Sequence, residues 1–343
     1  MSPANPGQGV LFLYLLRHRG DWEKSQMKGP RVLVTGATGF VGEAIVFRLL
    51  LDKVFTPVAA VRGETRLSGL CSVVPFDLSD KVALPSLTGV QVVIHCAARV
   101  HVMNDAATDP LAQFRKINVE GTVRLARKAA ESGVKRFIFI SSIKVNGEGT
   151  LPGVPFKADD QPSPVDPYGV SKKEAEDALR QVSRDTGMEV VIIRPPLVYG
   201  PGVKANFLSM MRWLDKGVPL PLGALNNRRS LVAIGNLVDL VIVCIAHPAA
   251  AGNTFLVSDG EDLSTSQLLR RMADAMNVPS RLLAVPAWLL SGGAILLGRR
   301  SLAQRLCGSL QVDIGKTCST LDWLPPVSVD EALRRTASQY RAK

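Results

Sequence analysis

The segment "RVLVTGATGFVG", residues 31–42, decides the fold prediction. It begins with a short run of β-branched and aliphatic residues, which is typical of a parallel strand covered on both faces. The segment that follows, "GFVGEAIVFRLLLD" (39–52), has the periodicity of an amphipathic helix. Gly36, Gly39 and Gly42 lie where the strand turns into the helix. This order of strand, glycine turn and helix predicts an α/β fold with a parallel sheet.

The glycine turn also predicts a dinucleotide site of the Rossmann type. Gly36 permits a tight turn, Gly39 lets the backbone approach a pyrophosphate, and Gly42 lets the helix pack closely on the strand. The helix N-terminus adds N–H groups and the positive end of a dipole. A turn that needs only flexibility is the structural alternative. The residues expected to contact the cofactor here are Gly36, Thr38, Gly39, Phe40, Val41 and Gly42.

Strand and helix patterns alternate along the next 150 residues. We expect further strands at 56–63, 90–98, 136–142 and 189–196, and helices at about 110–132 and 167–186. This alternation predicts a doubly wound parallel sheet. After Gly200 the sequence becomes richer in turns. We therefore expect an N-terminal extension (1–28), a Rossmann core (29–200) and a smaller substrate-binding lobe (201–343) that is interleaved with the core.

Composition narrows the function classes. The chain of 343 residues carries a net charge of +11, but its Lys and Arg residues are interleaved with acids and form no basic arm. This favours small polyanionic ligands such as nucleotides over nucleic acid. The 5 cysteines are scattered and the 4 histidines isolated, which indicates reduced thiols, a cytoplasmic location and no metal site.

Two apolar segments are too short to span a bilayer. "GVLFLYLLRHRG" (9–20) belongs to an extension that we expect to be poorly ordered; a surface helix, a weak membrane anchor or a start at Met27 are the alternatives. "VPAWLLSGGAILLG" (285–298) predicts a core or interface helix, with peripheral membrane contact as the alternative.

The second expected strand bears on the cofactor. A site for NAD normally ends this strand with Asp or Glu, which binds the ribose 2′-hydroxyl. Here the strand ends in "AAVRGETR", so Arg62 occupies that place, with Arg66 nearby. A guanidinium can bind a 2′-phosphate. The sequence therefore favours NADP(H), with NAD(H) as the alternative. Arg62 could also be a solvated surface arginine with no cofactor contact.

Tyr168 and Lys172 occur in "DPYGVSK" (166–172), at the start of an expected helix. Asp166 can cap this helix, and Pro167 suits its first position. Residues four apart share one helix face, so Tyr168 and Lys172 lie together on the inward stripe. A chance Tyr-x-x-x-Lys is common, and the pair alone indicates no more than a buried helix start.

Six motifs in order change that interpretation: "TGATGFVG", "FDLSD", "VVIHCAARVH", "FISSIKVNG", "YGVSK" and "RPPLVYGPG". With them the chain, from Arg31 to its end, resembles the extended short-chain dehydrogenases/reductases. It looks most like their NAD-dependent epimerase/dehydratase group, which acts on nucleotide sugars. The "SIKVNG" segment and the "LDWLPPVSVDEALRRT" tail resemble a subgroup of bacterial surface polysaccharide synthesis that includes 4-keto reductases of UDP-sugars.

The resemblance implies roles for individual residues. Ser142, Tyr168 and Lys172 match the catalytic residues of the family, and Lys172 also holds the nicotinamide ribose. The other positions implied to bind the cofactor are Asp77, Leu78, Ala97, Ala98 and Pro195. Those implied to meet the diphosphate of the substrate are Asn206 and Arg229. The Arg228–Arg229 pair in "NNRRSLVAIGN" is also a reasonable diphosphate clamp by its chemistry, with a solvated turn as the alternative.

The implied chemistry is proton transfer by Tyr168. A free phenol has a pKa of about 10. A nearby ammonium and a positive nicotinamide ring favour the phenolate, which can exchange a proton with a sugar hydroxyl or ketone. Relatives that dehydrate the sugar carry Asp-Glu after the serine, whereas this chain has Ile143 and Lys144, which disfavours dehydration. Asn146 replaces a Tyr found in many relatives and leaves the sugar-side contacts undefined.

Two reactions at C4 remain. Because of Arg62 we expect 4-keto reduction of a UDP-sugar, and 4-epimerisation with retained NAD is the alternative. A reductase of non-sugar ketones is a further alternative, disfavoured by Arg228 and Arg229. A non-enzymatic dinucleotide sensor is disfavoured by the Tyr168–Lys172 pair. The resemblance also implies a homodimer through the helices at 110–132 and 167–186.

Overall fold

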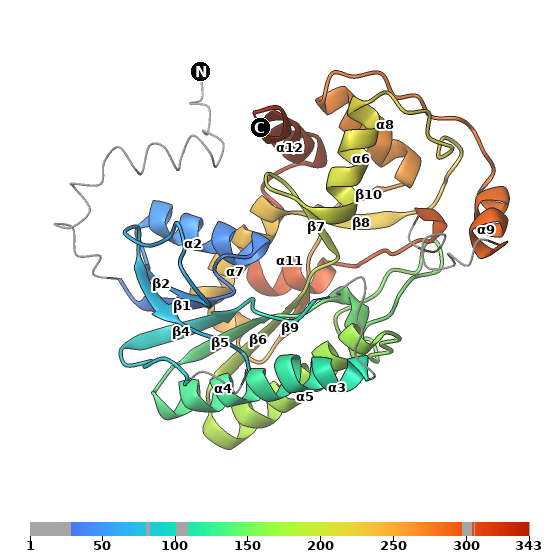
Figure 1. The fold of residues 1–343 in the computed structure, drawn as a ribbon. Helices are drawn as coiled ribbons and strands as arrows, with labels where there is room; N and C mark the ends of the chain where they lie inside the picture. Colours follow the sequence, from blue (N-terminus) through green and yellow to red (C-terminus); the bar gives the residue numbers. More distant parts are fainter. Residues whose placement is uncertain (1–28, 80–82, 101–108, 297–303, 305, 343) are drawn as a thin grey trace.

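The computed structural model describes residues 29–79, 83–100, 109–296, 304 and 306–342. The expectations for the N-terminal extension and for Met27 lie outside these residues. The fold comprises a larger sheet covered by helices on both faces and a smaller lobe built on a second sheet (Figure 1).

The larger sheet has seven strands, all parallel, in the order β3-β2-β1-β4-β5-β6-β9. The α/β doubly wound fold predicted from the sequence is confirmed. The strands are β1 (Arg31–Thr35), β2 (Thr56–Val61), β3 (Ser72–Pro75), β4 (Val90–His95), β5 (Arg136–Ile140), β6 (Glu189–Arg194) and β9 (Thr254–Leu256). Of these, β3 and β9 were not predicted as strands of this sheet.

Alternate residues of β1 serve opposite faces of the sheet. Val32 and Val34 pack in the cluster that holds α2 (Phe40–Asp52) and α7 (Ile234–Ala246). Leu33, between them, packs in the cluster that holds α4 (Gly121–Glu131) and α5 (Pro167–Thr186). Since successive side chains of a strand point to opposite sides, one apolar run builds both cores.

The segment predicted as one helix at 110–132 has three parts: α3 (Pro110–Phe114), η1 (Arg115–Glu120) and α4. Asp109 caps α3 by accepting the Ala112 N–H at 3.0 Å. η1 is a π-helical turn, a distortion that often occurs at functional sites. Its buried residue is Asn118, which turns toward α5.

The smaller lobe is built mainly from residues after Gly200, with β7 just before it, and contains a three-stranded sheet, β10-β8-β7. Its helices pack around a third apolar cluster that includes Phe207, Leu269 and Leu333. Its elements are β7 (Leu197–Tyr199), α6 (Ala205–Asp215), β8 (Arg229–Ala233), β10 (Asp262–Leu263), α8 (Thr265–Ala275), α9 (Ala287–Leu296) and α12 (Val329–Arg341).

The two parts are interleaved along the chain. β9 and α7 come after Gly200, yet β9 pairs with β6 in the larger sheet and α7 packs beside α2. The turns and short helices that complete the chain are η2 (Ile143–Val145), η3 (Pro248–Ala250) and α11 (Gly315–Leu321). α11 closes against β9, where the Thr317 hydroxyl donates to the Leu256 carbonyl at 2.6 Å. The exact border near residue 200 stays a prediction.

The apolar segment at 285–298 forms α9 over its described part. Trp288 is 71% exposed and Leu289 48%, so this helix is not a core helix, contrary to one of the two sequence expectations. Within the described part of the chain, none of the helices combines the length and apolar character that crossing a bilayer requires.

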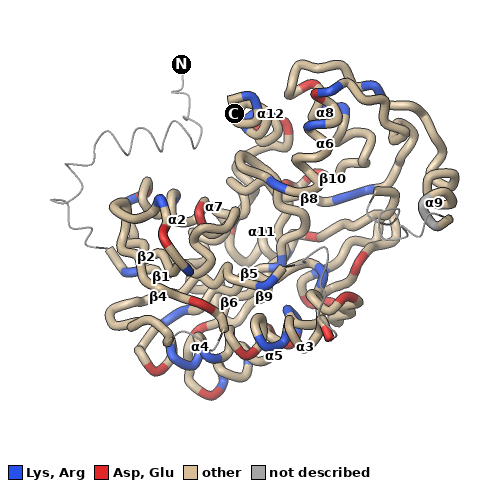
Figure 2. Tube along the Cα trace, viewed as in Figure 1, with Lys and Arg blue, Asp and Glu red and all other residues tan. Residues whose placement is uncertain are grey.

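Basic and acidic residues alternate over both parts of the described chain (Figure 2). Many of them form pairs, such as Arg136 with Glu189 and Arg271 with Glu261. The charge of the described residues is therefore spread over both parts.

Gly42 gives a test of this fold. A Cβ at this position would lie 2.3 Å from the Gly36 carbonyl oxygen, because α2 packs directly on the turn that follows β1. Gly42→Ala should lower the free energy of unfolding by about 1–3 kcal/mol, as overpacking does. The measurement is urea denaturation. Gly63→Ala is the control, since a Cβ there meets nothing within 4 Å; equal stability of Gly42→Ala and wild type would contradict this packing.

Candidate active site

The glycine turn links β1 to α2 at the carboxyl end of the sheet. Gly36 has a φ of +65°, and a Cβ on it would lie 2.8 Å from the Ala97 nitrogen after β4. Its carbonyl accepts the Gly39 N–H at 2.8 Å. The ends of β1 and β4 therefore meet where the strand order reverses, which is where open α/β sheets bind ligands.

The N-terminus of α2 fits a pyrophosphate. Gly39 is its N-cap and no described side chain caps the helix there. Thr38 and Gly39 are exposed, and Phe40 and Val41 are half-buried. Open N–H groups at a helix N-terminus attract an anion, so the turn suits the phosphates of a dinucleotide.

The two arginines after β2 differ in their surroundings. Arg66 forms a two-point ion pair with Glu43 in the first turn of α2, at 2.8 and 2.5 Å. Arg62 is exposed directly after β2. The expectation of a 2′-phosphate contact therefore depends on Arg62.

The remaining positions expected at the cofactor surround the same edge of the sheet. Asp77 accepts the Ser79 N–H at 2.7 Å, and Leu78 is buried against Gly121 of α4. Ala97 and Ala98 are half-buried after β4. Pro195, buried after β6, accepts the Ile143 N–H at 3.0 Å and so joins β6 to η2.

The helix that carries Tyr168 and Lys172 has the predicted limits. Asp166 caps α5 by accepting the Gly169 N–H at 2.6 Å, Pro167 lies in its first turn, and Gly187 ends it with a φ of +75°. Lys172 Nζ lies 6.0 Å from the centre of the Tyr168 ring. The two side chains share one face, as their spacing predicts.

Lys172 is held beneath the site. It is 2% exposed, donates to the Ile140 carbonyl at 2.8 Å and lies 4.3 Å from the centre of the Phe139 ring. Burial lowers its pKa to about 8, while Cys96 and Glu176 act in the opposite direction. Lys172 therefore keeps most of its positive charge at neutral pH.

Tyr168 is protonated in the protein alone. Burial, and after it the negative charge of Asp166, raises the pKa of the phenol above its usual range. Its ring packs edge-on against Phe114, with the ring centres 6.1 Å apart. The sequence-based expectation that an ammonium and a positive nicotinamide ring together favour the phenolate stays a prediction. Tyr168 starts as a proton donor, and it needs a further positive charge nearby to act as a base.

Ser142 lies between β5 and η2. It caps η2 and accepts the Lys144 N–H at 3.3 Å, with a half-buried side chain. A Cβ on Gly169 would lie 2.8 Å from the Lys144 carbonyl oxygen. Only glycine lets the first turn of α5 approach η2 this closely. The structure thus brings the segments of Ser142 and Tyr168 into direct contact.

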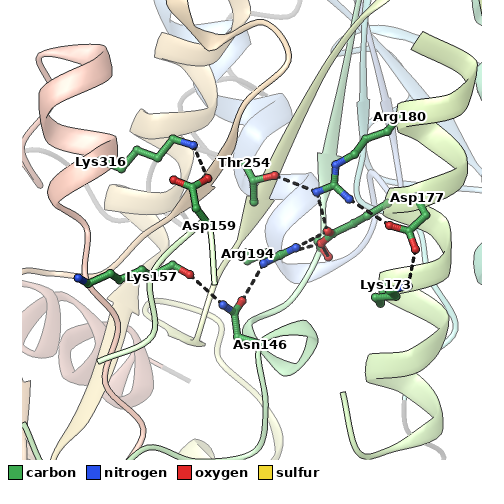
Figure 3. A network of polar contacts seen from close by, with 11 residues as sticks. Asn146, Lys157, Asp159, Lys173, Asp177, Arg180, Arg194, Thr254 and Lys316 are labelled. Carbon is green, nitrogen blue, oxygen red and sulfur yellow. Dashed lines mark hydrogen bonds and ion pairs between the residues drawn. The ribbon is translucent and has the colours of Figure 1, made fainter. Parts of the chain in front are cut away.

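A buried polar network supports both segments (Figure 3). Glu176 accepts hydrogen bonds from Ser141 Oγ at 2.6 Å and from Arg194 Nε and Nη2 at 2.9 and 2.6 Å. Arg194 Nη1 donates to Asn146 at 3.0 Å, and Asn146 donates to the Lys157 carbonyl. Asn146 is therefore a buried residue whose side chain bonds to Arg194 and to the Lys157 carbonyl.

Two candidate substrate residues lie in the smaller lobe. Asn206 is exposed in the first turn of α6. Arg229 begins β8 half-buried and donates to the Gly308 carbonyl at 3.0 Å; burial lowers its pKa. Their contact with a diphosphate stays a prediction.

Sequence reasoning missed Asn118. It is 1% exposed, accepts the Arg99 N–H at 2.8 Å, and donates to the Arg99 carbonyl and to Ser171 Oγ. It joins the end of β4 to α5 beside Lys172. An asparagine within a predicted helix is unfavourable, and that was the available signal.

His95 is buried but is no acid or base at neutral pH. Its ring lies between the hydroxyls of Thr35 and Thr122, at 2.7 and 3.0 Å. Burial, and after it Lys172, lowers its pKa to about 3. Among the described titratable side chains here, Tyr168 and Lys172 are the pair on one helix face that fits proton transfer.

Comparison with known proteins agrees with this geometry. The family described as NAD dependent epimerase/dehydratase matches residues 32–258. A UDP-glucose 4-epimerase of Vibrio cholerae is 50% identical over 312 residues, which cover 90% of this chain and 95% of that protein. A GDP-6-deoxy-D-mannose reductase of Pseudomonas aeruginosa is 27% identical over 322 residues, which cover 91% of this chain and 98% of that protein.

A similar fold occurs in solved structures. The UDP-glucuronic acid 4-epimerase of Bacillus cereus, in complex with NAD, has a TM-score of 0.73 at 19% identity, over 91% of this chain and 96% of that one. The motifs, the fold and the relatives agree: the chain belongs to the NAD-dependent epimerase/dehydratase family of enzymes.

Proposed function

We propose that this protein is a 4-epimerase of UDP-sugars that keeps NAD bound through its reaction cycle. The observation that carries the proposal is the 50% identity to a UDP-glucose 4-epimerase over nearly the full length of both chains. The placement of Ser142, Tyr168 and Lys172 at the carboxyl edge of the sheet supports it. The sequence alone favoured 4-keto reduction, through Arg62 and the resemblance of two segments to a subgroup that includes 4-keto reductases.

The residues around the glycine turn would hold the dinucleotide. Its pyrophosphate would lie at the N-terminus of α2, the adenine near Asp77 and Leu78, and the nicotinamide ribose within reach of Lys172. When bound, NAD supplies the chemistry of accepting a hydride from C4 of the sugar and returning it.

The chain's own residues move the proton. Tyr168 takes the proton of the C4 hydroxyl as C4 becomes a ketone, and it returns this proton to the ketone oxygen on the opposite face of the turned sugar. Positive charge at Lys172, and on the nicotinamide, stabilises the Tyr168 phenolate that takes this proton, and Tyr168 is a neutral phenol while the sugar is a ketone. Ser142 hydrogen-bonds the same sugar oxygen and orients it. Asn206 and Arg229 would bind the diphosphate while the sugar turns.

Dehydration has no residues to support it here. Ile143, directly after Ser142, is buried in an apolar cluster, and Lys144 is bonded to Asp166. Neither can supply the acid and base needed to remove a C5 proton and expel a hydroxyl.

Reduction of a 4-keto UDP-sugar by NADPH is the second candidate. Arg62 favours it, because it stands exposed after β2, where an acid would bind the ribose of NAD. The relative in Pseudomonas aeruginosa is a reductase, at 27% identity. In either reaction we propose a cytoplasmic enzyme that acts as a homodimer.

Tyr168→Phe should abolish proton transfer while it keeps the ring packed on Phe114. Turnover should fall by roughly 10²–10⁴-fold, as expected for loss of a general acid–base group. Steady-state kinetics measures this, and fluorescence titration should show that the cofactor still binds. Tyr340→Phe is the control: its hydroxyl donates to Asp215 at 3.1 Å in the smaller lobe. Near-normal turnover of Tyr168→Phe would remove Tyr168 from the mechanism.

The cofactor balance separates the two reactions. A 4-epimerase restores its NAD in every cycle, so purified protein should interconvert UDP-glucose or UDP-N-acetylglucosamine with the galacto epimers without added cofactor. Product analysis by chromatography and absorbance at the nicotinamide band measure both outcomes. The proposal fails if the protein instead consumes NADPH mole for mole with a UDP-4-keto-6-deoxy-N-acetylhexosamine and leaves UDP-glucose unchanged.

Arg62→Asp should shift cofactor preference toward NAD(H). The change removes a partner for a 2′-phosphate and supplies a carboxylate for the ribose hydroxyl. The ratio of the NADH and NADPH dissociation constants should move by roughly ten- to hundredfold, the value of one charge-assisted hydrogen bond. Lys128→Asp, an exposed charge reversal on α4, is the control. An unchanged ratio of the two dissociation constants would mean that Arg62 contacts solvent and not the cofactor.

A further inference from the structure

Lys144 is bonded to both segments that carry the candidate catalytic hydroxyls. Its backbone N–H donates to Ser142 Oγ at 3.3 Å. Its side-chain ammonium donates to Asp166 Oδ2, two residues before Tyr168. Lys144 therefore contacts Ser142 directly, and it contacts α5 through the capping residue Asp166.

Asp166 is engaged by both of its oxygens. Oδ1 accepts the Gly169 N–H at 2.6 Å, in the turn of α5 that holds Tyr168. Oδ2 accepts from Lys144 of η2. Because the carboxylate is rigid and planar, these two bonds fix the start of α5 against η2.

The surroundings keep this link in place. The side chains of Lys144 and Asp166 are 24% and 19% exposed, and Glu148 lies 3.1 Å from the same ammonium. Such half-buried pairs are screened less by solvent and salt than surface pairs. Gly169 packs on the Lys144 carbonyl, and the Ser163 N–H donates to the Val145 carbonyl at 3.0 Å. We therefore expect a small displacement of Lys144 to displace Tyr168 as well.

We propose that Lys144 is a positioning residue that, through Asp166, fixes the separation between Ser142 and Tyr168. The inference rests on the proposed function, because both hydroxyls are assigned there to the same sugar oxygen. Lys144 touches neither substrate nor cofactor in this role.

The link has an electrostatic side as well. Among the described residues, the charged groups around Tyr168 include Asp166 at the cap of its helix and Lys172 within it. From other segments come Lys144 of η2 with its partner Glu148, and Arg99 after β4, which lies over the adjoining Phe114 ring. The negative charge of Asp166 raises the pKa of Tyr168. Lys144 partly neutralises that charge, so it assists the tyrosine in losing its proton.

The test compares Lys144→Met, Asp166→Asn and the double variant. Asn still caps a helix, so Asp166→Asn removes charge but keeps α5. Each single variant breaks the link. Turnover should fall by roughly ten- to hundredfold with little change in KM, since a small displacement of a catalytic group has this effect. The double variant should be no slower than the slower single variant, as expected for two residues in one interaction.

The pH profile distinguishes positioning from a loss of stability. Without Lys144, Asp166 raises the pKa of Tyr168 further, so the rise of turnover with pH should shift to higher pH. Without the Asp166 charge, that pKa falls and the rise should shift to lower pH. Lys144→Arg should restore turnover because it keeps the ion pair. Lys173→Met, which breaks the exposed pair with Asp177 at 2.7 Å on the same helix, should leave rate and profile unchanged.

Wild-type turnover and pH profile in Lys144→Met would overturn the proposal. The proposal would also be overturned if the two single variants lost turnover equally, the double variant lost the sum of both, and both pH profiles shifted in the same direction. If wild-type protein epimerises none of the UDP-sugars, the proposed function fails while this inference stays testable. ¹⁹F NMR of protein containing 3-fluorotyrosine, with the Tyr168 signal assigned by Tyr168→Phe, gives the same titration without substrate: its midpoint should rise in Lys144→Met and fall in Asp166→Asn.

Discussion

The buried ion pair between Glu176 and Arg194 is the interaction on which the candidate site depends. Glu176 is 0% exposed and Arg194 2%, so both charges have lost their water. Such a pair is tolerated only when its remaining hydrogen bonds are made, and removing one partner typically costs about 3–5 kcal/mol. Here Ser141, Arg180 and Asn146 complete the set. The pair fastens α5 to β6 one helical turn after Lys172.

The same network sets the electrostatics of the site. Cys96 and, after it, Glu176 oppose the lowering of the Lys172 pKa that burial causes, so the ammonium near Tyr168 keeps most of its charge. Ser141, which bonds to Glu176, directly precedes Ser142. The buried Glu176 carboxylate thus helps to keep Lys172 charged, and it holds the segment of Ser142 in place through Ser141.

Local signals predicted α5 residue by residue, because Asp166, Pro167 and Gly187 act through their own neighbours in sequence. The glycine turn was also predicted correctly for this reason. The partners of Asn146 and Asn118 could not be predicted, since each bonds to residues that the fold brings together from distant positions.

The type of reaction is the point on which one residue and the whole-chain comparison differ. Arg62 is one surface residue, and it favoured a reductase, whereas half of all aligned positions agree with a 4-epimerase. Identity summed over a whole chain reflects many contacts, most of which no single motif records.

The return of the chain to the first sheet has a consequence for folding. β6 has its outer neighbour only when β9 arrives, after the chain has already built β7, α6 and β8. α2 likewise packs against α7, which follows β8. A fragment that stopped at residue 200 would leave an open strand edge and an uncovered apolar helix, a combination prone to aggregation. We therefore expect the larger sheet with its helices and the smaller lobe to fold together as one cooperative unit, and neither part to fold alone.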